Sequence, residues 1–273
     1  PVVGASRRAG RLLVRVNVND IAAKGGEPAF MAVTLILPPS MGEDAVASIM
    51  REIHEECFEN GIAVVGGHTE FNDIYRHPVL SASLIGMADS VFRASDIAEG
   101  DTVFVSKHIG IEGMAILASD RPDLLRDFFS PEEICEIEGW MDMTSILEEA
   151  RLLRGVASFM HDPTEGGFMG GMKEICSLSG LSVDFSAEDV PLHRYTKRAS
   201  AALGFDPLRL VASGSVIAVI PEEKALEAAK MFEGSPTGIS RIGSMARNTG
   251  SSGVPQNCEE ELWALLKRER RSV

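Results

Sequence analysis

Residues that could do chemistry follow a short apolar run at 157–160, which predicts a buried strand. The first two of them are His161 and Asp162. Pro163 then forces the chain to turn, because its ring fixes φ and its nitrogen has no proton to donate to a ladder. Thr164 comes next, and its side-chain oxygen predicts the N-cap of a new helix. This order places polar side chains between a strand and a helix start.

Two glycines, Gly166 and Gly167, would leave backbone N–H groups uncovered at the predicted helix start. Such a start carries a partial positive charge, so it favours an anion such as phosphate. Asp162 lies just outside it and is a candidate to hold a hard cation against the phosphate. The segment therefore predicts a metal–nucleotide site, with His161 and Asp162 as candidate catalytic residues.

A second polar cluster follows a short predicted strand at 62–65. Paired glycines after a buried strand let a ligand approach the backbone closely, although such a pair is more often a simple turn. Polar side chains then follow at the predicted strand end. The cluster consists of Gly66, Gly67, His68, Thr69 and Glu70.

The segment Arg11–Asp20 alternates β-branched and polar residues, which predicts a strand. Arg15, Asn17 and Asn19 would then share one face, which ends at Asp20. Two amides and a carboxylate in a row can line a polar ligand site. Equally, the segment can be a barrel strand with one wet face, followed by a helix that Asp20 caps. The residues alone leave both interpretations open.

Three predicted strands thus end in polar clusters, and ligands of α/β proteins bind at strand ends. Carboxylates with glycine-rich helix starts fit Mg²⁺ and phosphate better than zinc, which favours Cys and closely grouped His. Ser213 lies in Ala-Ser-Gly-Ser rather than in the G-x-S-x-G elbow of esterases. The chain has no Walker A motif, which excludes a P-loop enzyme.

Length and charge narrow the function classes. A chain of 273 residues can bury a large core, and its length predicts two domains. The formal charge of −14 argues against a nucleic-acid partner but not against ATP neutralised by Mg²⁺. No apolar run approaches the ~20 residues of a membrane span, so no membrane partner is expected. The four scattered cysteines form no C-x-x-C pair, which predicts reduced thiols in a cytoplasmic protein.

Strands and helices are expected along the rest of the chain from apolar runs, helical spacing and glycine stops. A capping box at Ser40–Glu43 predicts a helix that stops at Asn60. Two adjacent strands about a tight glycine turn are predicted over 209–214 and 215–220. Other expected strands cover 29–37, 79–87, 102–106, 181–185 and 238–245, and other clear helices cover 110–118 and 194–203.

Four motifs occur in an order that resembles the AIR synthase (PurM-like) superfamily. They are V-N-D-I-A-A-K-G-G-E-P at 18–28, G-G-H-T-E at 66–70, G-D-T-V-F-V-S with G-I-E-G at 100–113, and H-D-P-T-E-G-G at 161–167. The resemblance extends to about residue 245. Within the superfamily, H-D-P-T-x-G-G, L-G-F-D-P-L at 203–208 and A-S-G-S-V-I-A-V-I at 212–220 look most like the carbamoyl-dehydrating [NiFe]-hydrogenase maturation factors.

The resemblance implies an α/β (α+β) fold with two domains, at 1–92 and 93–273. The N-terminal domain would pair with that of a second copy into a shared β-barrel, and the C-terminal domain would be an α/β sandwich. ATP would lie in a cleft near the interface of this homodimer. The implied activity is ATP-dependent activation of a small carbonyl-type substrate as a phosphate ester.

The resemblance also implies roles for individual residues. Asp20 would be a Mg²⁺ ligand, with His68 and Glu70 where relatives often have an acid after the glycine pair. Asp162 and His161 would be the catalytic residues. The implied nucleotide-binding residues are Asn17, Asn19, Gly66, Gly67, Thr69, Thr164, Gly166 and Gly167.

Two further features depart from the superfamily pattern. Relatives carry a Gly-rich segment and an acidic first strand, which would lie upstream of Pro1. The maturation factors carry their substrate on a C-terminal cysteine, whereas this chain ends at Val273 and Cys258 lies too far inside. We therefore expect an ATP-dependent enzyme that does not make hydrogenase cyanide ligands. The competing hypothesis is a non-catalytic dimeric protein that binds a nucleotide or metabolite.

Overall fold

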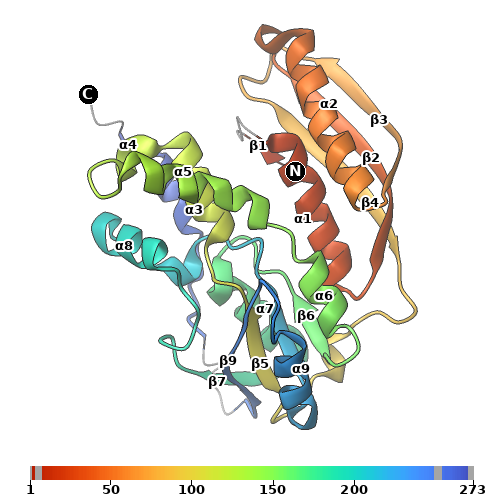
Figure 1. Ribbon diagram of the computed structural model, residues 1–273, viewed down its shortest axis with the longest axis vertical. Helices are drawn as coiled ribbons and strands as arrows, with labels where there is room; N and C mark the ends of the chain where they lie inside the picture. The colour runs from red at the N-terminus through yellow and green to blue at the C-terminus, as the bar shows by residue number, and fades with distance from the viewer. Residues whose placement is uncertain (1, 4–7, 249–253, 270–273) are drawn as a thin grey trace. The chain divides into compact units, whose positions relative to one another are not determined.

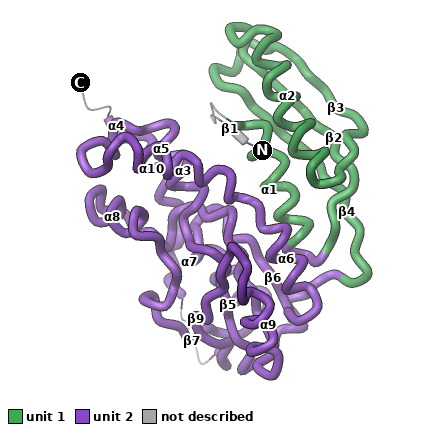
Figure 2. The backbone as a smooth tube through the Cα atoms, viewed as in Figure 1, with its two compact units in different colours: residues 1–22, 26–90 green, residues 23–25, 91–273 purple. Residues whose placement is uncertain are grey.

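The computed structural model describes residues 2–3, 8–248 and 254–269. Contacts within the chain divide it into two compact units, which Figure 2 shows in different colours. Unit 1 comprises residues 1–22 and 26–90, and unit 2 comprises residues 23–25 and 91–273. Each unit has its own sheet, in the strand orders given below. The protein therefore has a mixed α/β architecture.

Unit 1 consists of a four-stranded sheet with two long helices on one of its faces (Figure 1). The strand order is β1-β4-β2-β3; β2 pairs parallel with β3 and antiparallel with β4. The parallel pair is joined through helix α2, as a parallel connection requires. The elements are β1 (Val2–Val3), α1 (Ala9–Ala23), β2 (Glu27–Leu37), α2 (Gly42–Glu59), β3 (Ala63–Phe71) and β4 (Val79–Met87).

Helix α1 replaces the strand that was expected over Arg11–Asp20, so that prediction is wrong. Val14, Val18 and Ala22 are buried and recur every four residues, which is helical spacing. Their β-branched side chains disfavour a helix only slightly, and burial of a whole stripe outweighs that preference. On a helix, Asn17 and Asn19 no longer share a face, because residues two apart point in different directions.

A buried ion pair joins α1 to α2. Arg15 donates from Nε to Oε1 of Glu56 at 2.7 Å and from its terminal nitrogen to Oε2 at 3.0 Å. Both side chains are almost fully buried. Two parallel hydrogen bonds fix the orientation of the guanidinium as well as its distance.

The expected capping box at Ser40–Glu43 is wrong, because α2 begins at Gly42 without a side-chain cap.

Unit 2 contains an antiparallel five-stranded sheet in the order β6-β8-β5-β9-β7. Its strands are β5 (Thr102–Ser106), β6 (Phe159–His161), β7 (Ser182–Phe185), β8 (Ile217–Ile220) and β9 (Ile239–Ala246). Its helices are α3 (Ile111–Asp120), α4 (Pro122–Leu125), α5 (Pro131–Gly139), α6 (Leu147–Leu153), α7 (Gly167–Ser179), α8 (Arg194–Leu203), α9 (Ala225–Met231) and α10 (Glu261–Leu266).

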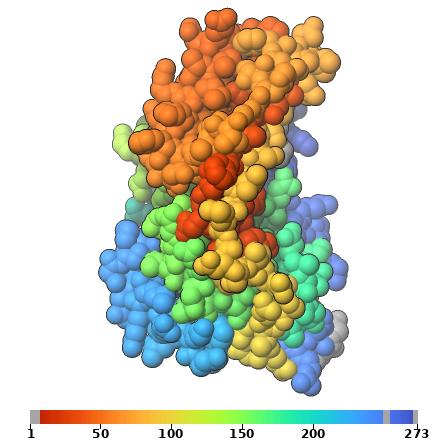
Figure 3. Space-filling view, turned by 90° about the vertical axis from the view of Figure 1, so that its right-hand side faces the viewer, coloured from red at the N-terminus to blue at the C-terminus, as the bar shows by residue number. Residues whose placement is uncertain are grey.

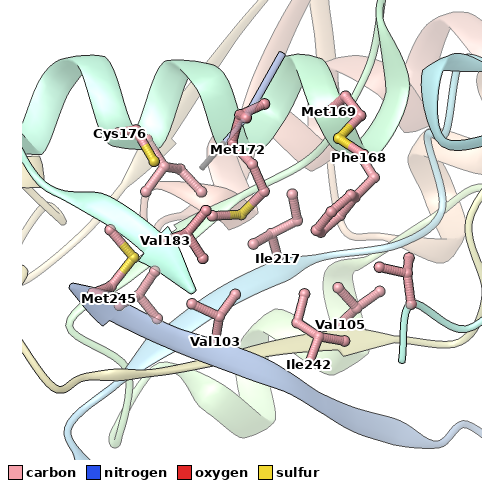
Figure 4. Close-up of a cluster of buried hydrophobic side chains, with 14 of the residues drawn as sticks. Val103, Val105, Phe168, Met169, Met172, Cys176, Val183, Ile217, Ile242 and Met245 are labelled. Carbon is pink, nitrogen blue, oxygen red and sulfur yellow. The ribbon is translucent and has the colours of Figure 1, made fainter. Parts of the chain in front are cut away.

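Helix α7 packs its apolar stripe onto this sheet, as Figure 4 shows. Phe168, Met172 and Ile175 recur at helical spacing and are fully buried. They meet alternating residues of the strands, such as Val103 and Val105 of β5. This packing fixes the helix whose start carries the predicted phosphate site.

The expected strand over 209–214 is wrong. Residues Pro207–Arg209 form a 3-10 turn instead, and β8 begins only at Ile217. Asp206 caps that turn by accepting the Leu208 N–H at 3.0 Å, which favours a bend rather than a strand.

Among the helices of the described residues, none is both long enough and apolar enough to cross a membrane.

Candidate functional site

The loop between β6 and α7 carries the HDPTEGG motif. Helix α7 begins at Gly167 with Gly166 as its N-cap and no side-chain cap, so the expected Thr164 cap is wrong. Gly166 and Gly167 have φ of 76° and 59°, a left-handed conformation that glycine adopts without steric cost. The two glycines delay the helix beyond Thr164, whose carbonyl accepts the Gly167 N–H at 3.0 Å.

The start of α7 is filled by other parts of the same chain. The Gly166 N–H donates to Oε2 of Glu260 at 2.7 Å. A β-carbon on Gly167 would lie 2.5 Å from the Leu210 carbonyl oxygen and 2.7 Å from that of Leu208. The Glu260 carboxyl group therefore lies at this helix start, in the place where the sequence predicts a phosphate.

Glu260 connects three segments of unit 2. Its Oε1 accepts the Val211 N–H at 3.0 Å and caps α10 by accepting the Leu262 N–H at 2.8 Å. Burial raises the pKa of Glu260, the three backbone donors lower it, and the nearby Glu165 charge raises it further. The carboxylate thus ties the HDPTEGG loop to the C-terminal helix.

His161 and Asp162 lie together at the end of β6. His161 is the last residue of the strand and Asp162 is buried directly after it. Nε2 of His161 lies 2.7 Å from Oε2 of Glu174, a residue of α7. The hydrogen bond from His161 is the main cause that lowers the pKa of Glu174. Thr164, by contrast, is exposed on the loop.

In unit 1 the cluster Gly66–Glu70 lies inside strand β3 and not beyond its end, so the expected strand end at Val65 is wrong. One irregularity of register lies before the glycine pair, at Val65, and regular pairing with β2 then continues through Gly66 and Gly67 as far as Leu37. A pocket of about 400 Å³ is lined by this part of β3. Its lining residues are Val33, Met50, Val64, Val65, Gly66, Gly67, His68 and Thr69.

His68 and Glu70 lie on one face of β3, two residues apart. Nε2 of His68 is 3.2 Å from Oε2 of Glu70, and Asn72 donates to Oε1 of the same carboxylate at 3.2 Å. These two hydrogen bonds lower the pKa of Glu70, with that from His68 as the larger cause. Glu70 is therefore an ionised carboxylate on the strand whose preceding residues line the pocket.

The three candidate residues of α1 have different surroundings. Asn17 donates to the Leu13 carbonyl at 2.8 Å, one turn back in its own helix. Asn19 is fully buried, whereas Asp20 is exposed. Within the described residues, no three His, Cys, Asp or Glu side chains are grouped closely enough to hold a metal. Asp20, His68 and Glu70 therefore form no three-ligand centre within the chain.

Two side chains beside the candidate site carried no signal in the sequence. Glu174 and Glu260 contact the HDPTEGG loop from positions 13 and 94 residues away from their partners. Glu174 follows a lysine on the polar face of a helix, a pattern typical of a solvated surface. Only the packing of α7 and α10 brings these carboxylates to the loop.

Comparison with known proteins identifies the family. The model of the N-terminal domain of AIR synthase related proteins matches residues 1–88, and that of their C-terminal domain matches residues 98–254. The chain belongs to the AIR synthase related protein family. A similar family member is a hydrogenase expression/formation protein of Methanocaldococcus jannaschii, 28% identical over 232 residues, which cover 84% of this chain and 67% of that protein.

Other members of the family share a similar degree of identity. The carbamoyl dehydratase HypE of Rhizobium leguminosarum is 28% identical over 79% of this chain and 61% of its own length. The thiamine-monophosphate kinase of Pyrococcus abyssi is 28% identical over 80% of this chain and 67% of its own length. The chain thus spans about two thirds of these relatives.

Solved structures of the family share the fold. HypE of E. coli superposes with a TM-score of 0.76 at 20% identity, over 89% of this chain and 75% of that chain. HypE in complex with ATP gives 0.74 at 21% identity, over 90% and 74% of the two chains. A thiamine-monophosphate kinase with AMPPCP and TMP gives 0.72 at 20% identity, over 88% and 74%. HypE has also been solved in complex with HypF.

Proposed function

We propose that this protein is an ATP-dependent enzyme that binds Mg–ATP and activates a small carbonyl-type substrate by phosphoryl transfer. The observation that carries the proposal is the match of both family domains in one chain. Support comes from relatives of this fold that are solved with ATP or with AMPPCP and TMP. The names of the relatives include both a carbamoyl dehydratase and a thiamine-monophosphate kinase, which differ in substrate.

We infer that the nucleotide contacts unit 1 at the pocket of β3, through Gly66, Gly67 and Thr69. Asp20 is exposed and is proposed as a Mg²⁺ ligand, with His68 and Glu70 as the other candidates. Mg²⁺ in nucleotide sites is commonly held by one or two carboxylates together with phosphates, so a group of three protein ligands is not required. The donor set of the chain fits that requirement.

Several other residues assigned to the nucleotide are buried or already hydrogen-bonded within the chain, which limits how they can act. Asn19 is buried, so its proposed role is to support the backbone beside the phosphates rather than to contact them. Asn17 is bonded to its own helix. Thr164, Gly166 and Gly167 are proposed as nucleotide contacts at the start of α7. Gly166 can offer its N–H to a phosphate only after Glu260 leaves it.

We also propose a homodimer that pairs residues 1–92 of two copies. The outer face of the unit 1 sheet is apolar at one end: Phe30 opposes Ile85 across β2 and β4, and Met87 follows on the same face. Ile85 is 63% exposed and Met87 is 69% exposed. In Figure 3 the orange and yellow segments of unit 1, which include β3 and β4, lie at the molecular surface. Contiguous exposed apolar residues are typical of an association surface.

Light scattering after size exclusion tests the dimer. Ile85→Asp is expected to convert a dimer to a monomer, because it places a charge on the apolar face. Leu226→Asp on α9 is the matched control, since Leu226 is 68% exposed outside unit 1. A wild-type monomer, or a dimer that survives Ile85→Asp, contradicts the proposal.

Calorimetry with Mg–ATP tests the function itself. Wild type is expected to bind, and Asp20→Asn and Asp162→Asn are each expected to weaken binding by about tenfold or more. Asp73→Asn and Asp189→Asn remove exposed carboxylates elsewhere in the two units and serve as controls. If wild type does not bind Mg–ATP, or if both site variants bind as wild type does, the proposal is overturned.

The alternative is a non-catalytic protein that binds a nucleotide or metabolite. The filled start of α7 favours it, because Glu260 takes the place of a phosphate there. His68 where relatives often have an acid favours it as well. Binding of Mg–ATP without turnover, with or without small amides, formyl compounds or thiocarboxylates, would support this alternative over the enzyme.

A further inference from the structure

The ammonium group of Lys107 lies inside unit 2, directly after strand β5, on a side chain that is only 7% exposed. Its Nζ donates to the backbone carbonyls of Ser145 at 2.6 Å, Gly214 at 2.8 Å and Met143 at 3.2 Å. The carboxylate of Glu149 supplies a fourth oxygen, since its Oε1 lies 2.9 Å from Nζ. We refer to these four oxygen atoms as the Lys107 cage.

The Lys107 cage has the chemistry of a site for a large monovalent cation. An ammonium group has three N–H donors, so at least two of the four oxygens share one proton. Mg²⁺ and Ca²⁺ bind oxygen at about 2.0–2.1 Å and 2.3–2.6 Å, so oxygens at 2.6–3.2 Å from the centre are too distant for them. Carbonyl oxygens replace the hydration shell of K⁺ in channels. One carboxylate balances one positive charge, as burial requires.

The Lys107 cage joins segments that are far apart in the sequence. Met143 and Ser145 precede helix α6, whereas Gly214 precedes strand β8. A β-carbon on Gly214 would lie 2.7 Å from the Met143 carbonyl oxygen, so these two segments are in close contact around the ammonium. Strand β8 begins with Ile217, the register partner of His161. The cation therefore holds the segment that leads into the strand beside a candidate catalytic residue.

The backbone of Lys107 has a φ of 51°, in the left-handed region that favours glycine. Within the described residues, Arg8 is the one other non-glycine residue with a positive φ. Such a conformation costs a lysine free energy, and it persists only where surrounding contacts determine it. A glycine at this position would remove the ammonium without adding backbone strain.

We propose that the Lys107 cage is a monovalent-cation site that the protein fills with its own ammonium group, and that free NH₄⁺ or K⁺ takes the site when this side chain is removed. Lys107 is then a positioning residue for the segment before β8. Because its cation is tethered, wild type needs no free cation at this site. Li⁺ is too small to contact all four oxygens, and choline is too large to enter. This inference does not depend on the proposed function.

Urea unfolding of Lys107→Gly tests the site in the chlorides of NH₄⁺, K⁺, Li⁺ and choline at one ionic strength. At a tenfold excess of NH₄⁺ or K⁺ over its Kd, the unfolding equilibrium constant is expected to be about tenfold lower than in choline. Wild type and Lys230→Ala, which removes an exposed ammonium on α9, are expected to show no such saturable response. If Lys107→Gly does not fold in choline, the refolding yield in each salt is measured instead, with recovery expected in NH₄⁺ and K⁺ only.

Two further measurements locate the bound cation. In the double variant Lys107→Gly with Glu149→Gln the carboxylate charge is lost, so the half-maximal NH₄⁺ concentration is expected to rise about tenfold or more. Crystals of Lys107→Gly soaked in rubidium chloride are expected to show anomalous density between the carbonyls of Ser145 and Gly214. A midpoint or refolding yield of Lys107→Gly that does not depend on the cation would overturn the inference. The same response with and without Glu149, or rubidium bound only elsewhere, would overturn it as well.

Discussion

The carbonyl oxygen of Val33 lies 2.0 Å from the place where a β-carbon on Gly67 would be. Val33 and Gly67 are register partners in the parallel pair β2–β3. The close approach explains why a glycine is needed at this point of the strand. Gly66, its neighbour, has open space at the same position.

Gly67→Ala is expected to destabilise unit 1 by about 2 kcal/mol or more, because the methyl group forces β2 and β3 apart. Gly66→Ala is the matched control and is expected to change stability by about 0.5 kcal/mol or less. Urea unfolding of both variants measures the difference. Equal stability of the two variants would show that the β2–β3 approach is not as close as described.

Glu260→Ala is expected to lower the free energy of unfolding by about 1–3 kcal/mol, because the N–H groups of Gly166 and Val211 lose their acceptor. Glu260→Gln keeps an amide oxygen and is expected to lose less. Glu259→Ala is the control, since Glu259 is exposed beside it. Thermal unfolding measures all three, and an unchanged midpoint for Glu260→Ala would contradict the role assigned to this carboxylate.

His108 is expected to make the protein less stable in acid. Burial lowers its pKa from 6.5 to about 4, and the charges of His193 and Lys107 act in the same direction. Between these two values the unfolded chain binds the proton and the folded chain does not. Stability therefore falls as the pH drops from about 6.5 to about 4, by roughly 3 kcal/mol at most.

His108→Phe removes this titration and keeps an aromatic ring against Trp140, whose ring centroid lies 4.7 Å away. The variant is expected to lose less stability than wild type between pH 7 and about pH 4.5 in urea unfolding. His77→Asn, at an exposed position, is expected to keep the wild-type slope. Parallel pH profiles for wild type and His108→Phe would refute the assignment.

Glu56→Ala is expected to destabilise unit 1 by about 3–5 kcal/mol, because it leaves the buried Arg15 guanidinium without this carboxylate. The double variant Arg15→Met with Glu56→Met is expected to recover most of that loss, since two apolar side chains of similar length fill the same space. Urea unfolding of the single variants Arg15→Met and Glu56→Met and of the double variant forms a double-mutant cycle. Additive losses would mean that the two side chains do not interact.

Local sequence patterns correctly predicted the elements in which local propensity and tertiary packing favour the same structure. The strands β4 and β5 and helix α8 have the bounds that alternation and the Gly204 stop predict. The strand prediction for Arg11–Asp20 failed because its β-branched residues favour a strand, while burial of the stripe Val14, Val18 and Ala22 selects a helix. The prediction that a strand ends at Val65 was wrong because pairing with β2 continues through Gly66 and Gly67.

The candidate site was predicted only in part for a related reason. Sequence motifs identified His161, Asp162 and the two glycines of the loop, since these residues lie together along the chain. Glu174 and Glu260 were missed, because hydrogen bonds between distant segments depend on how helices pack and leave no local pattern.

Residues 23–25 belong to unit 2, although the chain on both sides of them belongs to unit 1. A fragment that begins at Val91 would therefore lack a piece of its own fold. It would lose Lys24 from the ring of Phe159, and the backbone carbonyl of Lys24 that accepts the Phe92 N–H at 3.3 Å. Dissection of this protein by simple truncation would leave the second half incomplete, whereas a split that grafts these three residues onto the second half would preserve its contacts.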